Sequence, residues 1–316
     1  MEVFYERRKV QMLDFRMDTF LAVCRCMNFT KAAEELNITQ PAVSHHIHYL
    51  EEHYQVKLFG YSGKKIGLTE AGRLLLSAAT TMQHDELHLK QALQMSEGGG
   101  RRLVFGATMT VGEYVLPEAL MRLMDAQPDI SVKMVVADTQ DLLRSLDEGE
   151  IEFAVVEGFF QKKEYDFLVY DRGKFVIVAS PEYRFHSEGK VIEDLTRERF
   201  FIREPGSGTR YVFERYLEGK NLLIHDFEDL MEISNIGAIK SLVADGRGIT
   251  FLYEAAVKRE LEEGSLRRVE LEDFELSHDF TFIWRKDSIY ADYYRELYRL
   301  LRGVNCNGLY FLKEHS

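Results

Sequence analysis

Apolar side chains between residues 17 and 54 recur at the spacing of one buried face on an α-helix. The pattern is interrupted twice, so it predicts three short helices and not one long one. The core positions of the first helix are Phe20, Leu21 and Cys24, and those of the third are Val43, Ile47 and Leu50. The preceding residues, 1–16, are polar and show no clear period.

Capping residues mark where the second and third helices begin. Thr30 is the expected N-cap of the second, because a threonine hydroxyl can accept a hydrogen bond from a free backbone amide. Thr39 is the expected N-cap of the third, and Pro41 stands just inside that helix, where its missing N–H costs nothing. Only residues 37–39 separate the two helices, which makes them a candidate helix-turn-helix.

A β-hairpin is predicted directly after the third helix. Two strand-like runs, VKLF at 56–59 and KIGL at 65–68, flank a glycine-rich turn at 60–63. Lys64 and Lys65 stand at its tip. A helix-turn-helix followed by a basic hairpin is typical of a winged helix.

Residues 71–96 predict one long helix with a seven-residue apolar repeat that Glu86 interrupts. The repeating positions are Leu75, Ala79, Met82, Leu89 and Leu93. Three such heptads favour a short coiled coil and therefore a dimer, although a helix packed on its own domain would show a similar pattern. Gly98, Gly99 and Gly100 then predict a flexible joint.

From residue 101 onward, strand-like and helix-like segments alternate, which predicts mostly parallel sheets with helices on both faces. About 200 residues of this kind form either one domain or two lobes. The predicted strands are LVFGA, ISVKMVVA, FAVVEG, KFVIVAS, RFFIRE and GITFLY, and the predicted helices are VGEYVLPEALMRLMDA, TQDLLRSLDEG, YVFERYLEGK and NIGAIKSLVADG.

Charge is distributed unevenly along the chain. The net charge of −12 alone speaks against a nucleic-acid partner. Residues 1–73, however, contain 10 Lys and Arg against 9 Asp and Glu, whereas the remainder contains 30 against 43. A near-neutral N-terminal part joined to an acidic body suggests two separate tasks.

Composition makes the cytoplasm the expected compartment. Hydrophobic residues make up 46% and charged residues 29%, as in ordinary globular proteins. No run of about 18 apolar residues occurs, so neither a transmembrane helix nor a membrane partner is expected. The charged N-terminus is no secretory signal, and the 3 cysteines are too few for a disulfide framework.

The third helix carries the candidate DNA contacts. Gln40, Ser44, His45 and His48 occupy its first turns, the part of a recognition helix that meets base edges. A glutamine can make a bidentate contact with adenine, and the wing lysines suit phosphate. For both the helix residues and the wing lysines, the alternative is a surface that faces solvent and contacts no DNA. A metal site at His45 and His48 is not expected, because no third ligand is near in sequence.

Two loops in the acidic part are candidates for binding a small anion. Residues 108–112 and 205–209 each link a strand to a helix N-terminus, where free amides and hydroxyls favour negative charge. Such loops lie beyond the carboxyl ends of parallel strands, where ligands of this fold class bind. The alternative to anion binding is that the glycines and threonines of these loops only form tight turns and N-caps. The candidate effector contacts are Thr108, Met109, Thr110, Thr139, Arg203, Ser207, Gly208, Thr209 and Arg210.

Catalytic and cofactor motifs are not found. GxSxG, Walker A, HExxH and GxGxxG patterns do not occur, so no catalytic residue, metal or cofactor is predicted. Cys24 and Cys26 point about 200° apart on a helix and cannot form a redox pair. An enzyme on a two-lobed fold and a ligand-binding module without DNA function are the competing hypotheses.

Residues 20–72 resemble the N-terminal signature of LysR-type transcriptional regulators. The matching features are Ala32-Ala33, Leu36, Gln40-Pro41-Ala42-Val43-Ser44, Ile47, Leu50-Glu51, Leu58-Phe59 and Leu68-Thr69-Glu70-Ala71-Gly72. GATMTVGEYVLPEAL and REPGSGTR are similar to the subgroup that contains regulators of cysteine metabolism and carbon fixation. Tyr61 departs from the pattern, since the family usually has arginine there.

The resemblance implies a multidomain protein with an all-α winged helix-turn-helix DNA-binding domain, a long linker helix and an α/β two-lobed effector domain like periplasmic binding proteins. The predicted divisions are an N-terminal extension (1–11), the DNA-binding domain (12–73), a dimerisation helix (74–97), a glycine hinge (98–100), the effector domain (101–302) and a tail (303–316). The family usually starts near Met12, which suggests translation from that residue.

The resemblance also implies a homotetramer on an interrupted dyad of promoter DNA, and a metabolite in the cleft between the lobes that alters transcription. It leaves open a dimer, and RNA polymerase as a further partner. By position, Gln40, Pro41 and Ser44 would meet bases. Thr108, Thr110, Thr139, Ser207 and Thr209 would hold the effector.

Overall fold

The computed structural model describes residues 14–63, 65–96, 102–187 and 190–303. Lys64, the extension 1–11, the hinge 98–100 and the tail after residue 303 lie outside this range. The chain divides into two compact units, one of residues 1–94 with 147–150, the other of 95–146 with 151–316. Each unit is described by itself.

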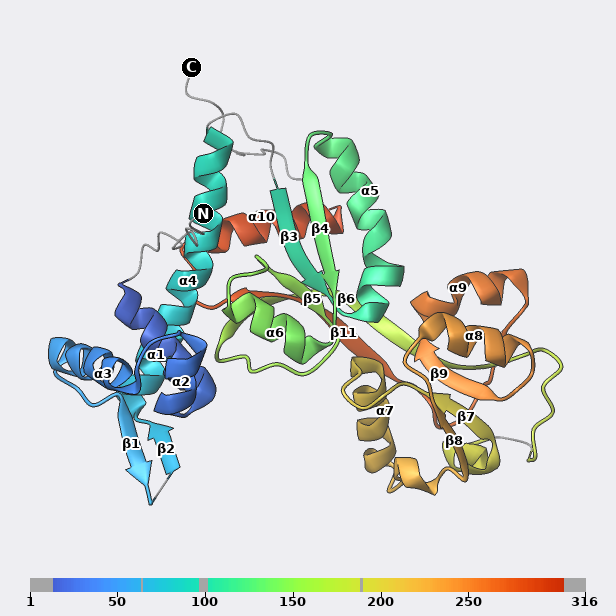
Figure 1. The fold of residues 1–316 in the computed structure, drawn as a ribbon. Helices are drawn as coiled ribbons and strands as arrows, with labels where there is room; N and C mark the ends of the chain where they lie inside the picture. The colour runs from blue at the N-terminus through green and yellow to red at the C-terminus, as the bar shows by residue number, and fades with distance from the viewer. Residues whose placement is uncertain (1–13, 64, 97–101, 188–189, 304–316) are drawn as a thin grey trace, which may run out of the picture. The chain divides into compact units, whose positions relative to one another are not determined.

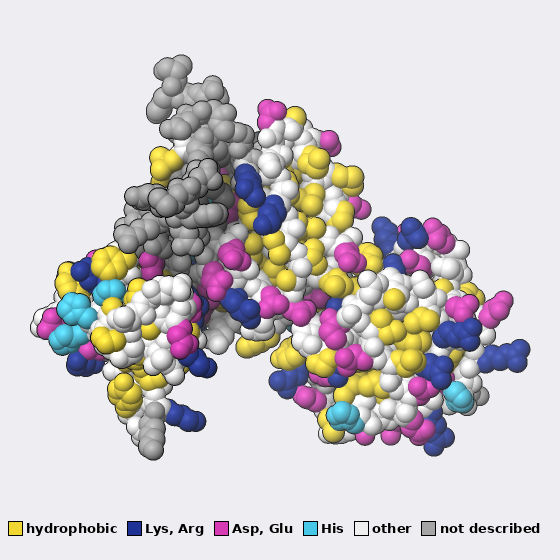
Figure 2. All heavy atoms as spheres, in the orientation of Figure 1, with side chains coloured by type: hydrophobic (Ala, Val, Ile, Leu, Met, Phe, Trp, Pro, Cys, Tyr) yellow, Lys and Arg dark blue, Asp and Glu magenta, His cyan; other side chains and the backbone are white. Residues whose placement is uncertain are grey.

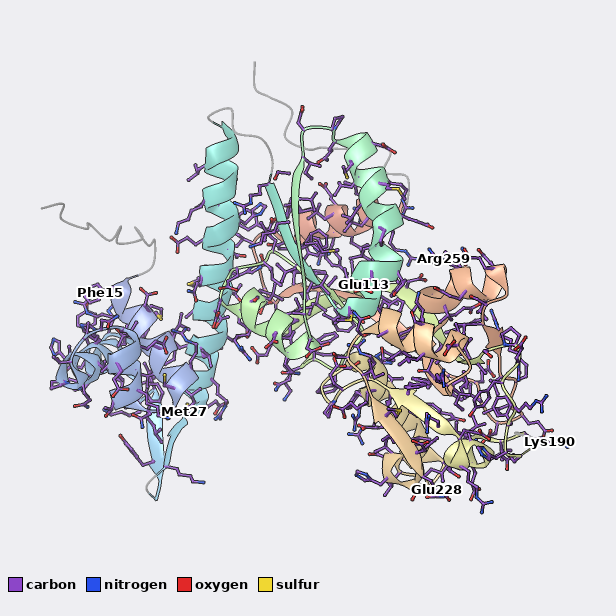
Figure 3. The ribbon with its side chains drawn as sticks, turned by 45° about the vertical axis from the view of Figure 1, so that its right-hand side comes forward. Phe15, Met27, Glu113, Lys190, Glu228 and Arg259 are labelled. Carbon is purple, nitrogen blue, oxygen red and sulfur yellow. The ribbon has the colours of Figure 1, made fainter. Side chains whose placement is uncertain are left out.

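The first unit is built on three short helices, labelled in Figure 1, and a side-chain view follows the first from Phe15 to Met27 (Figure 3). They are α1 (Phe15–Cys26), α2 (Phe29–Glu35) and α3 (Gln40–Tyr54). The predicted core positions of α3, Val43, Ile47 and Leu50, are all buried. They share one apolar cluster with Phe20 and Leu21 of α1, so both helices bury the faces that the periodicity indicated.

Helix α2 starts earlier than predicted. Its N-cap is Asn28, whose side-chain oxygen accepts hydrogen bonds from the amides of Thr30 and Lys31 at 2.8 and 3.1 Å. Thr30 therefore lies inside the helix, and its assignment as the cap was wrong. Asparagine caps as well as threonine does, so spacing alone could not decide between them. At α3, Thr39 caps as predicted, accepting from the Ala42 amide.

The hairpin and the long helix complete this unit. Strands β1 (Phe59–Ser62) and β2 (Lys65–Leu68) pair antiparallel, with Ser62 opposite Lys65. The turn is therefore tighter and later than the predicted 60–63, and Gly63 provides its positive φ of 63°. Helix α4 spans Glu70–Ser96 as one element. Its Ala79 is buried in the apolar cluster, while Met82 is 54% exposed in the single chain.

The second unit contains a nine-stranded sheet among the described residues. Its strands run in the spatial order β4-β3-β5-β11-β6-β9-β7-β8, with β10 paired to β6. Their bounds are β3 Arg102–Ala107, β4 Ser131–Val136, β5 Ala154–Val156, β6 Tyr165–Ala179, β7 Arg199–Ile202, β8 Asp229–Glu232, β9 Ile249–Tyr253, β10 Arg267–Arg268 and β11 Ser277–Arg285.

Helices cover both faces of this sheet. They are α5 (Leu116–Ala126), α6 (Thr139–Asp147), α7 (Gly208–Gly219), α8 (Ile236–Ala244), α9 (Glu254–Glu263) and α10 (Ala291–Arg302), with short turns at η1 (Val111–Val115), η2 (Ile192–Arg197) and η3 (Ile224–Asp226). No helix within the described residues combines the length and apolar character needed to cross a membrane.

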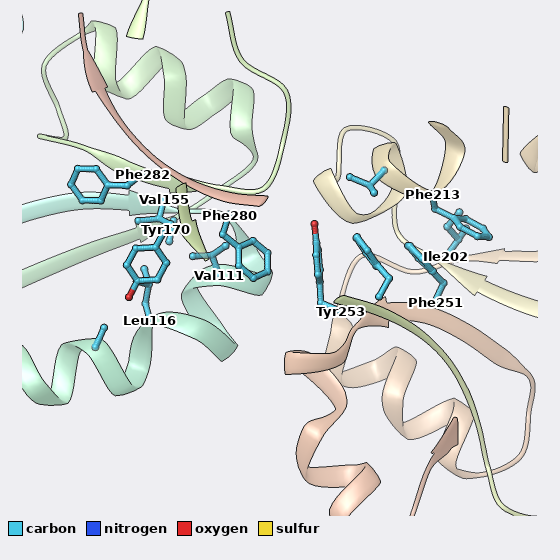
Figure 4. Close-up of a cluster of buried hydrophobic side chains, with 14 of the residues drawn as sticks. Val111, Leu116, Val155, Tyr170, Ile202, Phe213, Phe251, Tyr253, Phe280 and Phe282 are labelled. Atoms are coloured by element: carbon cyan, nitrogen blue, oxygen red, sulfur yellow. The ribbon is translucent and has the colours of Figure 1, made fainter. Parts of the chain in front are cut away.

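Side-chain alternation along the strands explains which helix covers which face. In β3, Leu103 and Phe105 pack in the cluster that holds α5 and α10, whereas Val104 packs in the cluster that holds α6. In β7, Phe200 packs with α7, while Phe201 packs with α8 and α9. Each end of the sheet thus has helices on both faces and forms one lobe. Figure 4 shows core side chains from both lobes.

The prediction of mostly parallel sheets was only partly right. Strand β3 pairs parallel with β4 and β5, and β7 pairs parallel with β8 and β9. Between these groups, β11 pairs antiparallel with both β5 and β6, and β6 pairs antiparallel with β9. Strand β6 is long because residues 165–174 pair with β11 and residues 175–178 with β9, so it runs through both lobes.

Candidate functional site

The first candidate site is the exposed start of α3. Gln40, Pro41, His45 and His48 are exposed and Ser44 is half-buried. The Gln40 amide donates a hydrogen bond to the Ser44 hydroxyl at 2.9 Å, one turn along the helix. This bond orients two polar groups that lie one turn apart on α3, beside its apolar face.

The histidines on this helix have local partners. His48 Nε2 lies 3.1 Å from a carboxylate oxygen of Glu52, one turn further along. His46, by contrast, is tied to α1, because its Nδ1 lies 2.9 Å from the Thr19 hydroxyl and its ring meets Phe15 edge-on. Burial lowers the pKa of His46, so this ring stays neutral at physiological pH. Among described residues, no three potential ligands gather as a metal site.

The hairpin presents its polar tip to solvent. Tyr61 is 73% exposed, and Lys65 is exposed as well. Figure 2 shows a basic side chain near this tip and histidines on the surface of the same unit. Lys64 lies outside the described residues. Thr30 is also exposed, on α2.

The predicted effector residues meet where strands end and helices begin. Thr108 and Thr110 follow β3, and Thr139 opens α6 in the same lobe. Ser207 and Thr209 stand at the start of α7 in the other lobe. The hydroxyls of Thr110 and Thr209 lie 3.5 Å apart, so the structure brings the two loops together.

These residues hold a set of buried polar atoms without hydrogen-bond partners in the described part of the chain. The atoms are Thr108 Oγ1, Thr139 Oγ1, Ser207 Oγ, Arg203 Nη1, Glu157 Oε2 and the Tyr253 hydroxyl. Buried polar groups are almost always paired, since an unpaired one costs about 1–3 kcal/mol. Six such atoms at the facing ends of two lobes indicate a site that a polar ligand completes.

Glu157, at the centre of this set, was missed by sequence reasoning. It follows β5 directly and is only 2% exposed. Its Oε1 accepts hydrogen bonds from Thr110 at 3.4 Å and Thr209 at 3.5 Å, one from each lobe. Burial raises the pKa of Glu157 to about 7 against the lowering effects of these hydroxyls and of Arg203.

Glycines allow the loops to approach this carboxyl group. A Cβ added at Gly208 would lie 2.5 Å from Glu157 Cγ, and one added at Gly158 would lie 2.2 Å from Thr139 Oγ1. Gly208 was expected to contact the effector. In the structure its lack of a side chain makes room for Glu157 instead. The signal in the sequence was a glutamate directly after an entirely apolar strand.

Of the two candidate arginines, only Arg203 is a member of this set. It is 2% exposed, and its Nε and Nη2 donate to Glu204 at 2.9 and 2.8 Å. Its Nη1 is buried and has no hydrogen-bond partner among the described residues. Arg210 donates hydrogen bonds to Glu214, to Glu232 and to the Arg203 carbonyl. These bonds tie the start of α7 to the end of β7. Met109 packs in the apolar cluster of α8 and α9.

A further carboxylate lies close to these groups. Asp138 comes just before α6, and a Cβ added at Gly206 would stand 3.8 Å from its Oδ2. Burial raises the pKa of Asp138, and the negative charge of Glu204 adds to that effect. The surroundings of Arg203 are therefore acidic.

Comparison with known proteins accounts for both units. Residues 16–73 match the family described as "Bacterial regulatory helix-turn-helix protein, lysR family", and residues 96–305 match the "LysR substrate binding domain". The transcriptional activator CmpR of Synechocystis is 31% identical over 86% of this chain and 88% of its own. The regulator CysL of Bacillus subtilis is 27% identical over 84% and 89%.

Solved structures show the same fold. ArgP from Mycobacterium tuberculosis superposes with a TM-score of 0.62 at 19% identity, covering 94% of this chain and 100% of its own. The CcmR regulatory domain from Synechocystis, solved with 2-PG, has a TM-score of 0.56 at 20% identity over 65% and 98%. With its helix-turn-helix and effector-binding domains, the chain belongs to the LysR family of DNA-binding transcriptional regulators.

Proposed function

We propose that the protein acts as a homo-oligomer that reads an interrupted dyad in promoter DNA. The exposed amide of Gln40, oriented by Ser44, suits the adenine edge in the major groove. His45 and His48 lie beside them on α3. Lys64 and Lys65 on the wing would add sequence-independent contacts with phosphate, as would Thr30 and Thr39 at the starts of the two helices.

Dimerisation would occur along α4. This helix is 27 residues long, and Met82 exposes an apolar side chain that a second copy would cover. A symmetric dimer matches a dyad, and pairs of dimers would give the tetramer. The same proposal includes the predicted domain divisions, a location in the cytoplasm and contact with RNA polymerase.

The effector is a small molecule with an acidic group, bound between the lobes. The observation that carries this proposal is the set of buried polar atoms without partners, contributed by both lobes. Hydroxyls of Thr108, Thr139 and Ser207 and the Nη1 of Arg203 supply donors for an anionic group. The related CcmR domain was solved with 2-PG, which fits a ligand of this kind.

DNA pull-down and sequencing with the purified full chain test the DNA-binding part. The experiment is run at two salt concentrations, because non-specific phosphate contacts weaken steeply with salt. Enrichment of a promoter dyad that survives the higher salt supports a sequence-specific regulator. Binding that is sequence-blind and lost at high salt would contradict the assignment of α3 as the reading helix.

A further inference from the structure

Glu157 adds a hydrogen-bond acceptor to the effector site, and a ligand that carries only acceptor atoms would leave this acceptor unpaired. Its Oε1 is used by two threonines, one from each lobe, while Oε2 is buried without a partner. An unpaired carboxylate oxygen in a dry site attracts a hydrogen-bond donor, and most strongly a positively charged one. The ligand therefore has to offer a hydrogen-bond donor as well as acceptors.

The charges around Glu157 point the same way. The neighbouring cation is Arg203, and two of its nitrogens are already engaged by Glu204. Asp138 adds a third carboxylate whose charge acts on Glu157. From the remaining elements, the buried Tyr253 hydroxyl lies near the Glu157 carboxyl group and the ring of His278 contacts the Glu157 backbone, and burial keeps both side chains neutral. Arg203 thus faces three carboxylates, of which Glu204 also lies near Arg210, so a ligand with a positive group suits the site better than a purely anionic one.

The other unpartnered atoms of the site are suited to an acidic group. Arg203 Nη1 is a donor, and the hydroxyls of Thr108 and Ser207 can donate as well. Ser207 is also the N-cap of α7, so the positive end of a 12-residue helix lies beside it. Unpartnered donors and an unpartnered acceptor in one site match a molecule with both kinds of charge.

We propose that the effector is a zwitterion of the amino-acid class, whose ammonium group binds Glu157 and whose carboxylate takes the donors of Thr108, Ser207 and Arg203. This inference rests on the proposed effector site and specifies its ligand. The ammonium group neutralises the buried carboxylate and supplies the hydrogen bond that Oε2 lacks.

A competing arrangement makes the opposite proton-exchange prediction. A protonated Glu157 could donate a hydrogen bond to an anion, and binding would then take up protons. An ammonium group instead holds Glu157 ionised, so binding releases them. With a pKa of about 7 in the free protein, the release at pH 7 is about half a proton per site.

The test is calorimetric titration of the full chain with the standard amino acids, each paired with the carboxylic acid that lacks its amino group. Titration at pH 7 in two buffers of different ionisation enthalpy gives the sign of proton exchange. We expect at least one amino acid to bind tenfold or more tightly than its paired acid, with proton release. In Glu157→Gln, the preference should shrink to about twofold and the proton release should disappear.

The outcomes separate this inference from the site on which it rests. Acids that bind as well as their amino counterparts, or binding with proton uptake, would overturn the zwitterion while leaving the effector site intact. If no amino acid, paired acid or inorganic phosphate binds, both proposals fail. Glu198→Gln is the control for folding, because Glu198 is equally buried but belongs to the loop of Tyr183 and His186.

Discussion

Replacing Glu157 by glutamine is expected to stabilise the effector domain at neutral pH. Burial raises the pKa of this carboxyl from 4.5 to about 7 in the folded protein. A raised pKa means that the folded state holds the proton more tightly than the unfolded chain does. The stabilisation due to that proton is full below pH 4.5 and is lost as the pH rises through 7. At about 1.4 kcal/mol per pKa unit, the loss amounts to about 3 kcal/mol.

Glutamine keeps the shape of the side chain but cannot ionise. Glu157→Gln should therefore match the wild type near pH 4.5 and exceed its free energy of unfolding by up to about 3 kcal/mol at pH 8. The single tryptophan, Trp284, is buried in the effector domain, so its fluorescence during urea unfolding of the full chain reports on that domain alone.

The matched control is Glu198→Gln at the same two pH values. Glu198 accepts hydrogen bonds from the Tyr183 hydroxyl at 2.9 Å and from the His186 amide at 2.7 Å. Its replacement should destabilise the domain at pH 8 by about 1.5–3 kcal/mol, because hydrogen bonds to a charged group are lost. If the difference between Glu157→Gln and the wild type does not change with pH, the carboxyl is not held protonated by burial.

Three further substitutions test the DNA-binding domain and the effector loops. Ser44→Ala should weaken specific DNA binding by about 1–3 kcal/mol in a fluorescence anisotropy titration; unchanged operator affinity would exclude a base contact. Thr108→Ala should leave operator affinity unaltered and abolish the effect of ligand on transcription in vitro, and an intact response would move the site elsewhere. Asn28→Ala removes the cap of α2 and should cost about 0.5–2 kcal/mol of stability by thermal unfolding, whereas Thr30→Ala should cost less.

The elements of the first unit could be predicted because their signals are local. Thr39, Pro41 and the spacing of Val43 and Ile47 all lie within one short segment, and they define α3 without help from the rest of the chain. The exception is informative. Asn28 and Thr30 are both good caps two residues apart, so the local sequence does not decide between them, and the structure has Asn28 as the cap.

The centre of the effector site depends on pairings that are distant in sequence. Thr110, Glu157 and Thr209 come from three separate segments, and the sequence around each residue does not predict its contact with the other two. Strand β11 escaped prediction for the same reason. His278 and Asp279 interrupt its apolar pattern, and it is defined by pairing with β6, about 100 residues earlier.

Strand β6, which runs through both lobes, restricts how an effector can act. In β6, the pairing partner changes from β11 to β9 between Lys174 and Phe175, next to Gly173, where an added Cβ would lie 2.5 Å from the Phe280 ring. This connection between the lobes is not a flexible linker, because residues 173–178 of β6 are all paired with a neighbouring strand. Any change in the angle between the lobes therefore has to bend β6 in this paired segment, close to Gly173.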